Sequence, residues 1–233
     1  MIILGLTLGH DASVSLLKDG KVVSSISCER VYRDKKTSHL DWVAIDYVLS
    51  AANTSFENVD YISVGGYDKW STDGFVKVYL DEEEDNPFNS ELPHLGKYGY
   101  DILKDNWLVS PTTDRNSLPF INVNVVIEGH YVKKGFLINH QTAHAASTFY
   151  TSPFNKSVIM TLDGSGEYPE KSGSYHYGDN DRLEMLGAPN TLIGVFYDKM
   201  TDWLSIGPGL TKAGTLMGLS SYGKPNEVAI NDW

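Results

Sequence analysis

The chain follows one plan twice: an apolar run, a turn that holds an acid among glycine or serine residues, and then a hairpin. The first copy is "LTLGHDASVSLLKDGKVV" at residues 6–23, and the second is "VIMTLDGSGEYPEKSGSYHY" at residues 158–177. Apolar runs rich in β-forming residues indicate buried strands, and Asp-Gly between two such runs indicates a hairpin. Each turn presents backbone N–H groups and a carboxylate at one place, which suits a phosphate with its divalent metal.

The segments between and after the two copies predict further strands and helices. Apolar residues at helical spacing predict an amphipathic helix over residues 40–53, with a short strand after it. A strand in "GFLINH" is expected to run into a helix in "LINHQTAHAASTFY", residues 137–150. We expect one more helix over residues 191–206, and a short helix and loop over residues 211–225.

Residues 67–131 give a weaker pattern, with an acidic run, many aromatic residues and scattered proline and glycine. We predict a variable insertion here, with some helix around residues 75–80 and 97–107. The acidic run indicates a solvated loop.

Charge and composition exclude several classes of protein. The 233 residues include 30 acids against 19 lysines and arginines, which gives a net charge of −11. Binding to nucleic acid or to an anionic membrane is not expected, because both need a surplus of basic side chains. Cys28 is the only cysteine, so no intrachain disulfide can form. No apolar run reaches the roughly 18 residues of a membrane span, and the N-terminus lacks the basic region of a signal peptide. We therefore expect a cytoplasmic protein.

His140 and His144 lie four positions apart in the predicted helix. Side chains at this spacing share one helix face about 5–6 Å apart, so the two imidazoles can bind one metal ion. Asp163 ends the next predicted strand and is the natural third ligand. Two imidazoles and a carboxylate suit Fe2+, Zn2+ or Mn2+ and leave positions open for substrate or water. The alternative is an ordinary helix surface, which is the commoner meaning of this spacing taken alone.

His10 and Asp11 follow the first strand, where Gly9 permits a tight turn. A histidine side chain can gain or lose a proton in the physiological pH range, so His10 could act as a general base on a hydroxyl or position an anion. Ordinary turn chemistry, with Asp11 bonded to its own backbone, explains the same residues equally well.

The second turn, "LDGSGE", has two glycines around Ser165. Ser165 does not match the elbow of a serine nucleophile, because the GxSxG pattern is absent. The turn suits a phosphate-binding loop better.

Taken in order, these motifs resemble one family. The segments "LGLTLGHDASVSLLKDGKVV", Glu29-Arg30, "NHQTAHAASTFY", "VIMTLDGSGE" and "GTLMGLSSYGKP" look like the O-carbamoyltransferases of the nodulation and antibiotic-tailoring type. The resemblance covers residues 1–65 and 136–225. It implies an α/β fold of the actin/sugar-kinase/Hsp70 type, which is a ribonuclease H-like lobe with a mixed sheet and flanking helices. This lobe is similar to the threonylcarbamoyl-transferring Kae1 proteins.

The resemblance also implies a reaction and roles for particular residues. In such enzymes a YrdC-like domain makes carbamoyl-adenylate from carbamoyl phosphate and ATP, and the Kae1-like domain transfers the carbamoyl group to a substrate hydroxyl. On this basis His140, His144 and Asp163 are expected to bind the divalent metal that holds the nucleotide phosphate, with Fe2+ as first choice. His10 falls on the catalytic histidine of the first loop, with Asp11 beside it. The residues expected at the nucleotide are Ser13, Gly164, Ser165 and Gly166.

Proteins of this family are much longer than 233 residues. We therefore expect residues 1–233 to form an incomplete, N-terminal part of the Kae1-like domain. The second lobe and the YrdC-like domain would be absent, and a second chain or a C-terminal part would carry them. Two alternatives stay open: an ATP-dependent kinase of the same superfold, and a non-catalytic nucleotide- or partner-binding subunit of a split enzyme. The sequence does not identify the hydroxylated acceptor.

Overall fold

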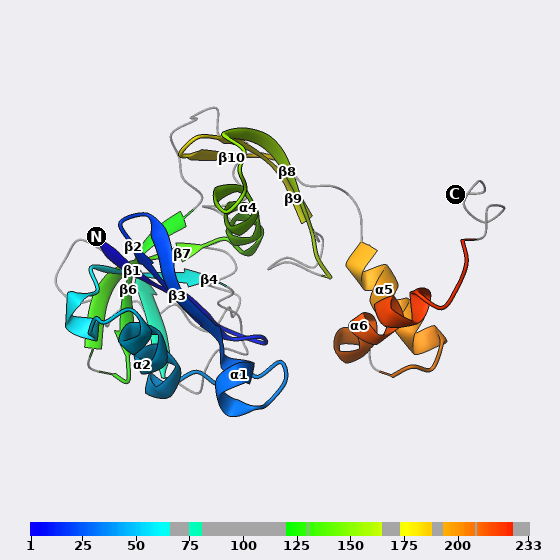
Figure 1. Ribbon diagram of the computed structural model, residues 1–233, viewed down its shortest axis with the longest axis horizontal. Helices are drawn as coiled ribbons and strands as arrows, with labels where there is room; N and C mark the ends of the chain where they lie inside the picture. The colour runs from blue at the N-terminus through cyan, green and yellow to red at the C-terminus, as the bar shows by residue number, and fades with distance from the viewer. Residues whose placement is uncertain are drawn as a thin grey trace.

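The computed structural model describes residues 1–65, 75–80, 120–129, 131–164, 173–187, 193–207 and 209–225. Figure 1 shows a large sheet covered by α2 (Trp42–Ala51), a smaller sheet beside α4 (His140–Tyr150), and a helix pair towards the C-terminus. The helices of that pair, α5 (Ile193–Trp203) and α6 (Gly209–Ser220), pack on each other. In the described part of the chain, no helix has the length and apolar character to cross a membrane. The α/β fold with a mixed sheet and flanking helices is confirmed.

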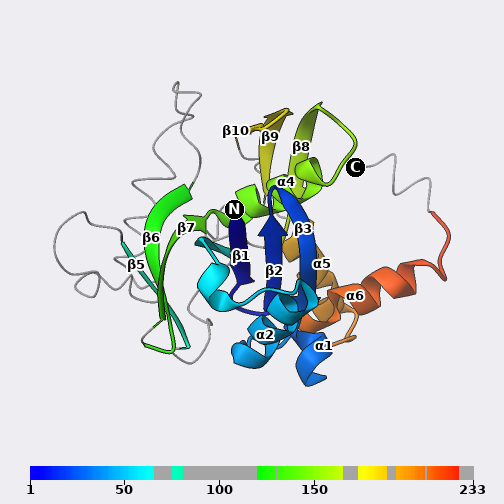
Figure 2. The same cartoon turned by 60° about the vertical axis from the view of Figure 1, so that its left-hand side comes forward.

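The large sheet has seven strands in the order β3-β2-β1-β4-β7-β6-β5. In chain order they are β1 (Ile2–Thr7), β2 (Ser13–Lys18), β3 (Lys21–Ser27), β4 (Tyr61–Gly65), β5 (Val76–Leu80), β6 (Phe120–Ile127) and β7 (Tyr131–Ile138). β1, β4 and β7 run parallel, so their carboxyl ends meet at one edge of the sheet. The remaining neighbours are antiparallel. That edge therefore receives both the turn after β1 and the helix after β7, as Figure 2 shows from a second side.

The main core lies between the sheet and α2. Alternate residues of β1 and β2 are buried: Leu4, Leu6, Val14 and Leu16. On α2, Ile45 and Val48 are fully buried in the same cluster. Asp41 begins α2, because its carboxylate accepts the backbone N–H of Val43 at 2.8 Å. Burying an aliphatic side chain such as Ile45 or Val48 contributes about 1.5–3 kcal/mol, so the apolar contact between α2 and the sheet holds the two together.

Two short helices connect these elements. α1 (Cys28–Tyr32) follows β3 directly, and the 3-10 helix η1 (Phe56–Asn58) lies shortly before β4. The sequence analysis predicts no helix at residues 28–32, so α1 is an additional element. Its first residue, Cys28, is fully buried, which places the helix against the core.

The smaller sheet repeats the start of the larger one. β8 (Lys156–Leu162), β9 (Gly173–Asp179) and β10 (Arg182–Gly187) form an antiparallel meander, as β1, β2 and β3 do. The two-copy plan of the sequence is therefore present in the fold. α4 packs on β8 and β9 through a second apolar cluster that includes Phe149 and Ile159.

Residues 67–131 contain two strands that the sequence did not predict. The helix expected around residues 75–80 is wrong, because β5 occupies this segment and pairs antiparallel with β6. Val76 and Val78 are fully buried, which is the alternation of a strand. The helix expected over 97–107 lies outside the described residues. The helices expected over 40–53, 137–150 and 191–206 are confirmed.

Gly135 lies in β7 between two neighbouring strands and tests this packing. A Cβ atom at this position would lie 2.2 Å from the carbonyl oxygen of Ile62 and 3.0 Å from a methyl group of Val125. We expect Gly135→Ala to lower the free energy of unfolding by about 1–3 kcal/mol, because the strands must move apart. Gly187→Ala is the control, since a Cβ there meets nothing within 4 Å. Equal urea midpoints for the two variants would contradict the packing.

Candidate metal centre

One residue separates the large sheet from the helix that carries both histidines. β7 ends at Ile138, and α4 begins at His140. The intervening Asn139 caps the helix, because its side-chain oxygen accepts the backbone N–H of Thr142 at 3.1 Å. Caps of this type contribute about 1 kcal/mol to helix stability. The start of α4 is therefore fixed at the carboxyl end of β7.

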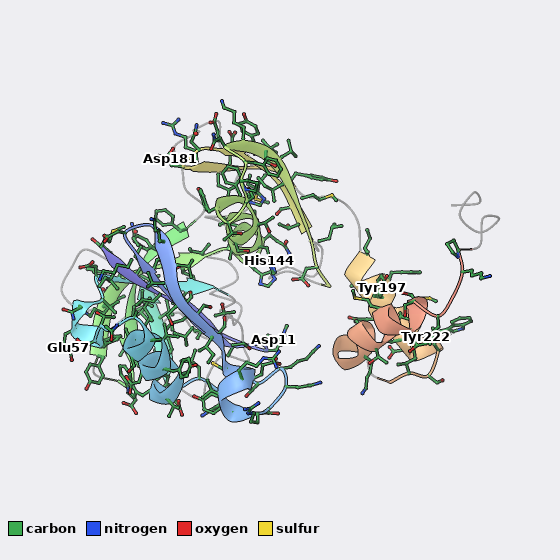
Figure 3. All side chains as sticks on the ribbon, in the orientation of Figure 1. Asp11, Glu57, His144, Asp181, Tyr197 and Tyr222 are labelled. Carbon is green, nitrogen blue, oxygen red and sulfur yellow. The ribbon has the colours of Figure 1, made fainter. Side chains whose placement is uncertain are left out.

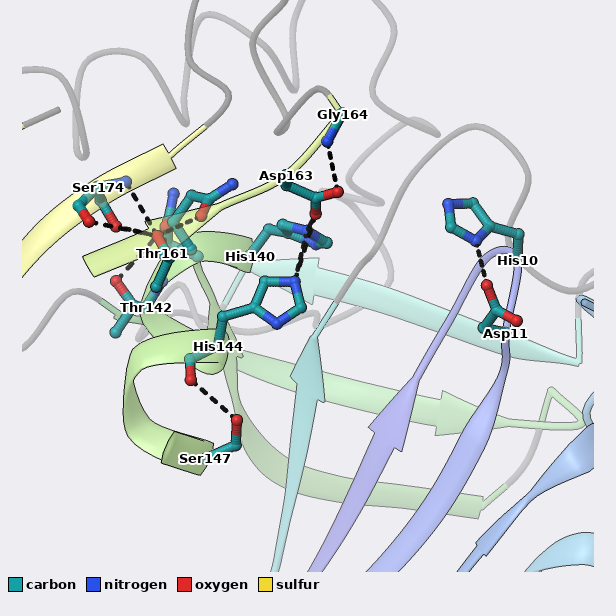
Figure 4. Close-up of polar contacts among 12 residues, drawn as sticks. His10, Asp11, His140, Thr142, His144, Ser147, Thr161, Asp163, Gly164 and Ser174 are labelled. Atoms are coloured by element: carbon teal, nitrogen blue, oxygen red, sulfur yellow. Dashed lines mark hydrogen bonds and ion pairs between the residues drawn. The ribbon is translucent and has the colours of Figure 1, made fainter. Parts of the chain in front are cut away.

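His140 and His144 share one face of α4, and Asp163 follows the end of β8 (Figure 4). The Nε2 atoms of the two histidines lie 3.0 Å apart. Oδ2 of Asp163 lies 2.7 Å from Nε2 of His140 and 3.4 Å from Nε2 of His144. In the described part of the chain this is the one group of three such side chains whose ligand atoms all lie within 4.8 Å of one another. The structure thus brings together the three residues that the sequence predicts as metal ligands.

The surroundings keep Asp163 ionised. Hydrogen bonds from His140 and His144 lower the pKa of the Asp163 carboxyl far below its ordinary value, against the opposing effect of burial. The backbone N–H of Gly164 also donates to this carboxylate, at 2.6 Å. The exposed fractions are 28% for His140, 52% for His144 and 37% for Asp163, so a ligand can reach the group from solvent.

The three donors fit a divalent transition metal. Metal bonds to imidazole nitrogen and carboxylate oxygen are about 2.1 Å long, which separates neighbouring ligand atoms by about 3.0 Å in an octahedron and 3.4 Å in a tetrahedron. The observed separations of 2.7, 3.0 and 3.4 Å span these values. Two histidines and one carboxylate on one side of an ion are typical of Fe2+ sites with open positions, and they also suit Zn2+ and Mn2+.

A buried polar network holds α4 against the smaller sheet. The Thr161 hydroxyl donates to the side-chain oxygen of Gln141 at 2.5 Å and lies 2.8 Å from the hydroxyl of Ser174. Ser174 contacts Nδ1 of His176 at 3.1 Å, and the hydroxyl of Thr142 lies 3.4 Å from Nε2 of the same histidine. These contacts lead from β8 through β9 back to α4. They therefore fix the helix that carries the metal ligands relative to the strand that Asp163 follows.

Sequence analysis missed this network, and His176 is its one ionisable residue. It is fully buried, and burial lowers its pKa to about 4. Its neighbours in the network are uncharged, so His176 is neutral at pH 7. The alternation of β9 could have placed it on the inner face, but nothing in the sequence indicates that α4 covers that face.

His10 and Asp11 form a second polar pair at the same edge of the large sheet (Figure 4). Nδ1 of His10 lies 2.7 Å from Oδ2 of Asp11. A carboxylate only accepts, so Nδ1 carries the proton and donates, and Nε2 remains available as a base. Asp11 has a φ of 62°, in the left-handed region that most non-glycine residues avoid. The turn therefore holds the backbone of Asp11 in an uncommon conformation, with its carboxylate beside the imidazole of His10.

The residues predicted at the nucleotide lie in different parts of the structure. Ser13 begins β2, where it pairs with Thr7 and Ser27 in the sheet. Gly164 follows Asp163 directly, whereas Ser165 and Gly166 lie outside the described residues. Gly194 of α5 packs on the same turn, a contact that sequence analysis missed. A Cβ at Gly194 would lie 2.4 Å from the carbonyl oxygen of Asp163.

The buried state of His176 makes stability depend on pH. The pKa of His176 is near 6.5 in the unfolded chain and about 4 in the folded chain. Between these two pH values the unfolded state therefore binds a proton at His176 that the folded state does not. The contribution is complete above pH 6.5 and is lost as the pH falls towards 4, by about 3 kcal/mol in total. We expect His176→Gln to remove this part of the pH dependence in urea unfolding between pH 7 and pH 4. Parallel stability curves for the two proteins would contradict the assignment.

Comparisons with known proteins identify the family of the chain. Residues 2–232 match the family model described as carbamoyltransferase N-terminus. The chain is 25% identical over 224 residues to the nodulation protein NolNO of Sinorhizobium fredii, across 94% of this chain and 28% of that protein. It is 27% identical over 231 residues to an uncharacterized protein of Synechocystis, across 95% of this chain and 34% of that protein.

A solved structure is also similar in outline. It is the activator of the 2-hydroxyisocaproyl-CoA dehydratase from Clostridium difficile with bound ADPNP, at a TM-score of 0.40 and 13% identity over 97% of this chain and 59% of that chain. The chain spans about a third of the length of the curated relatives it matches. Because the family model covers nearly every residue, the chain belongs to the family of carbamoyltransferase N-termini.

Proposed function

We propose that this chain performs the transfer step of an O-carbamoyltransferase, in which a carbamoyl group passes from carbamoyl-adenylate to a hydroxyl of the acceptor. The observation that carries the proposal is the convergence of His140, His144 and Asp163 from α4 and the end of β8. Family membership supports the reaction class, and this convergence supports a metal-assisted step at these three residues. Formation of carbamoyl-adenylate from carbamoyl phosphate and ATP is assigned to a YrdC-like domain, in a second chain or a longer form of the protein.

His140, His144 and Asp163 would hold the metal, and the bound ion would supply positive charge for the leaving phosphate. The chain itself would keep these three donor side chains together on one side of the ion. The buried network behind α4 resists their separation, and Gly164 donates to the carboxylate oxygen that faces away from the histidines. Gly164 and Ser13 are proposed as contacts of the nucleotide phosphate, and a Cβ atom at Gly164 would meet nothing within 4 Å.

His10 is proposed as the general base. The Asp11 carboxylate accepts a hydrogen bond from Nδ1–H of His10, which leaves Nε2 to take the proton of the acceptor hydroxyl. The hydroxyl oxygen forms a bond to the carbamoyl carbon, and the bond from that carbon to the phosphate oxygen breaks. AMP leaves with the electron pair of the broken bond, and the proton rests on His10. The products are an O-carbamoyl ester, AMP and one proton.

Metal binding tests the ligand assignment without any assay of activity. We expect His140→Ala and His144→Ala each to weaken Fe2+ binding at least about 100-fold in anaerobic calorimetry, because each removes one of three protein ligands. Thr148→Ala is the control, since Thr148 lies on the same helix and its hydroxyl bonds only to the carbonyl of His144 among the described contacts. Unchanged affinity in either histidine variant would show that the group does not bind the ion.

Activity tests the base. With carbamoyl-adenylate and an alcohol supplied, we expect His10→Gln to slow AMP release about 100-fold or more, because the acceptor proton loses its base. Fe2+ affinity should stay unchanged, since His10 is not a proposed ligand. Release of ADP from ATP would indicate a kinase, and AMP release that is independent of His10 would contradict the assigned base.

A further inference from the structure

Basic side chains concentrate in one short segment beside the His10–Asp11 turn. We name residues 29–36, which cover most of α1 and the loop after it, the basic loop. It holds four cationic residues, Arg30, Arg33, Lys35 and Lys36, against two acids, Glu29 and Asp34, and Arg30 lies 3.3 Å from the Glu29 carboxylate. All four are exposed, in a chain whose net charge is −11. Such a local excess of cations on an acidic protein calls for a reason.

The basic loop is tied at both ends to the residue that follows the turn. The backbone N–H of Cys28 donates to the carbonyl of Ala12 at 2.8 Å, and the N–H of Ala12 donates to the carbonyl of Thr37 at 3.0 Å. Cys28, Ala12 and Thr37 are all buried. The loop and the turn that carries His10 and Asp11 therefore form one unit.

Contacts within the segment hold its shape. The carboxylate of Glu29 accepts the backbone N–H of Lys36 at 3.5 Å, and the hydroxyl of Tyr32 donates to Asp41 at the start of α2. Arg33 and Lys36 have φ values of 58° and 57°. This left-handed state costs a non-glycine residue about 1–2 kcal/mol, so the surrounding contacts must maintain it. The cations are thus presented on a backbone that is already ordered.

The position of the loop relates it to the reaction. In the view of Figure 3, Asp11 lies between His144 on α4 and the helix α1. The backbone hydrogen bond from Cys28, the first residue of α1, to Ala12 keeps α1 beside this turn. If the donor phosphate lies at the histidines and the acceptor hydroxyl at His10, the body of the acceptor extends towards the basic loop.

We propose that the basic loop is a binding site for a phosphate-class oxyanion carried by one of the reactants. Guanidinium and ammonium groups bind such anions through charge-assisted hydrogen bonds, and Arg33 can do so with two donors at once. The place of the loop favours an anionic acceptor, such as a phosphorylated alcohol, over the donor nucleotide. The identity of the reactants rests on the proposed function, whereas the anion site itself does not.

Binding of inorganic phosphate tests the site directly. We expect the double variant Arg33→Gln/Lys35→Gln to bind phosphate at least about tenfold more weakly than the unmodified protein in NMR titration. The matched control is Lys18→Gln/Lys21→Gln, which removes the same charge at the β2–β3 turn, away from His10. Equal phosphate affinity in the two double variants would overturn the proposal.

Two further titrations identify the source of the anion. Loss of affinity for glycerol 3-phosphate, with affinity for AMP unchanged, would assign the loop to an acceptor, and the reverse would assign it to the donor nucleotide. Both results support the anion site, and unchanged affinity for both ligands overturns it. The titrations measure binding alone, so absence of carbamoyl transfer would contradict the proposed function without deciding this test.

Discussion

Asn139 is the point on which the arrangement of the candidate site depends. It follows the last parallel strand of the large sheet and caps the helix whose first residue, His140, is a proposed metal ligand. A longer connection would let α4 rotate about its axis, and both histidines would then turn away from Asp163. With a single connecting residue, the edge where β1, β4 and β7 end is also the place where His140 and His144 begin. Local capping chemistry thus sets the position of the predicted metal ligands.

Asp163 adds a constraint from outside the large sheet. Its strand, β8, belongs to the second meander, so the three ligands join two sheets that share no strand in the described part of the chain. The apolar contacts of α4 with β8 could slide by a residue, because aliphatic packing is not directional. The hydrogen bonds through Gln141, Thr161 and His176 have direction and do not tolerate such a shift. This explains why a fully buried histidine lies behind the site and not within it.

The sequence predicted which three side chains come together better than it predicted their surroundings. The i, i+4 spacing and a strand that ends in an acid suffice to find His140, His144 and Asp163, because both patterns are local. The same reasoning missed β5. Its short apolar run fits both strand and helix spacing, and the segment is a strand because it pairs with β6. It also missed the polar network and Gly194, since each depends on segments that are distant in the chain. Contacts of this kind leave no period in the sequence.

Net charge alone gave an incomplete picture of what the protein could bind. A charge of −11 repels phosphate compounds at long range, but this repulsion is screened within about 10 Å in physiological salt. At contact distance the local groups decide, and the edge of the large sheet offers imidazoles, backbone N–H groups and the cations of the basic loop. Asp11 and Asp163 are each hydrogen-bonded to histidine there, so their negative charge is partly offset. An acidic protein can therefore accept an anionic reactant at this edge while the rest of its surface repels one.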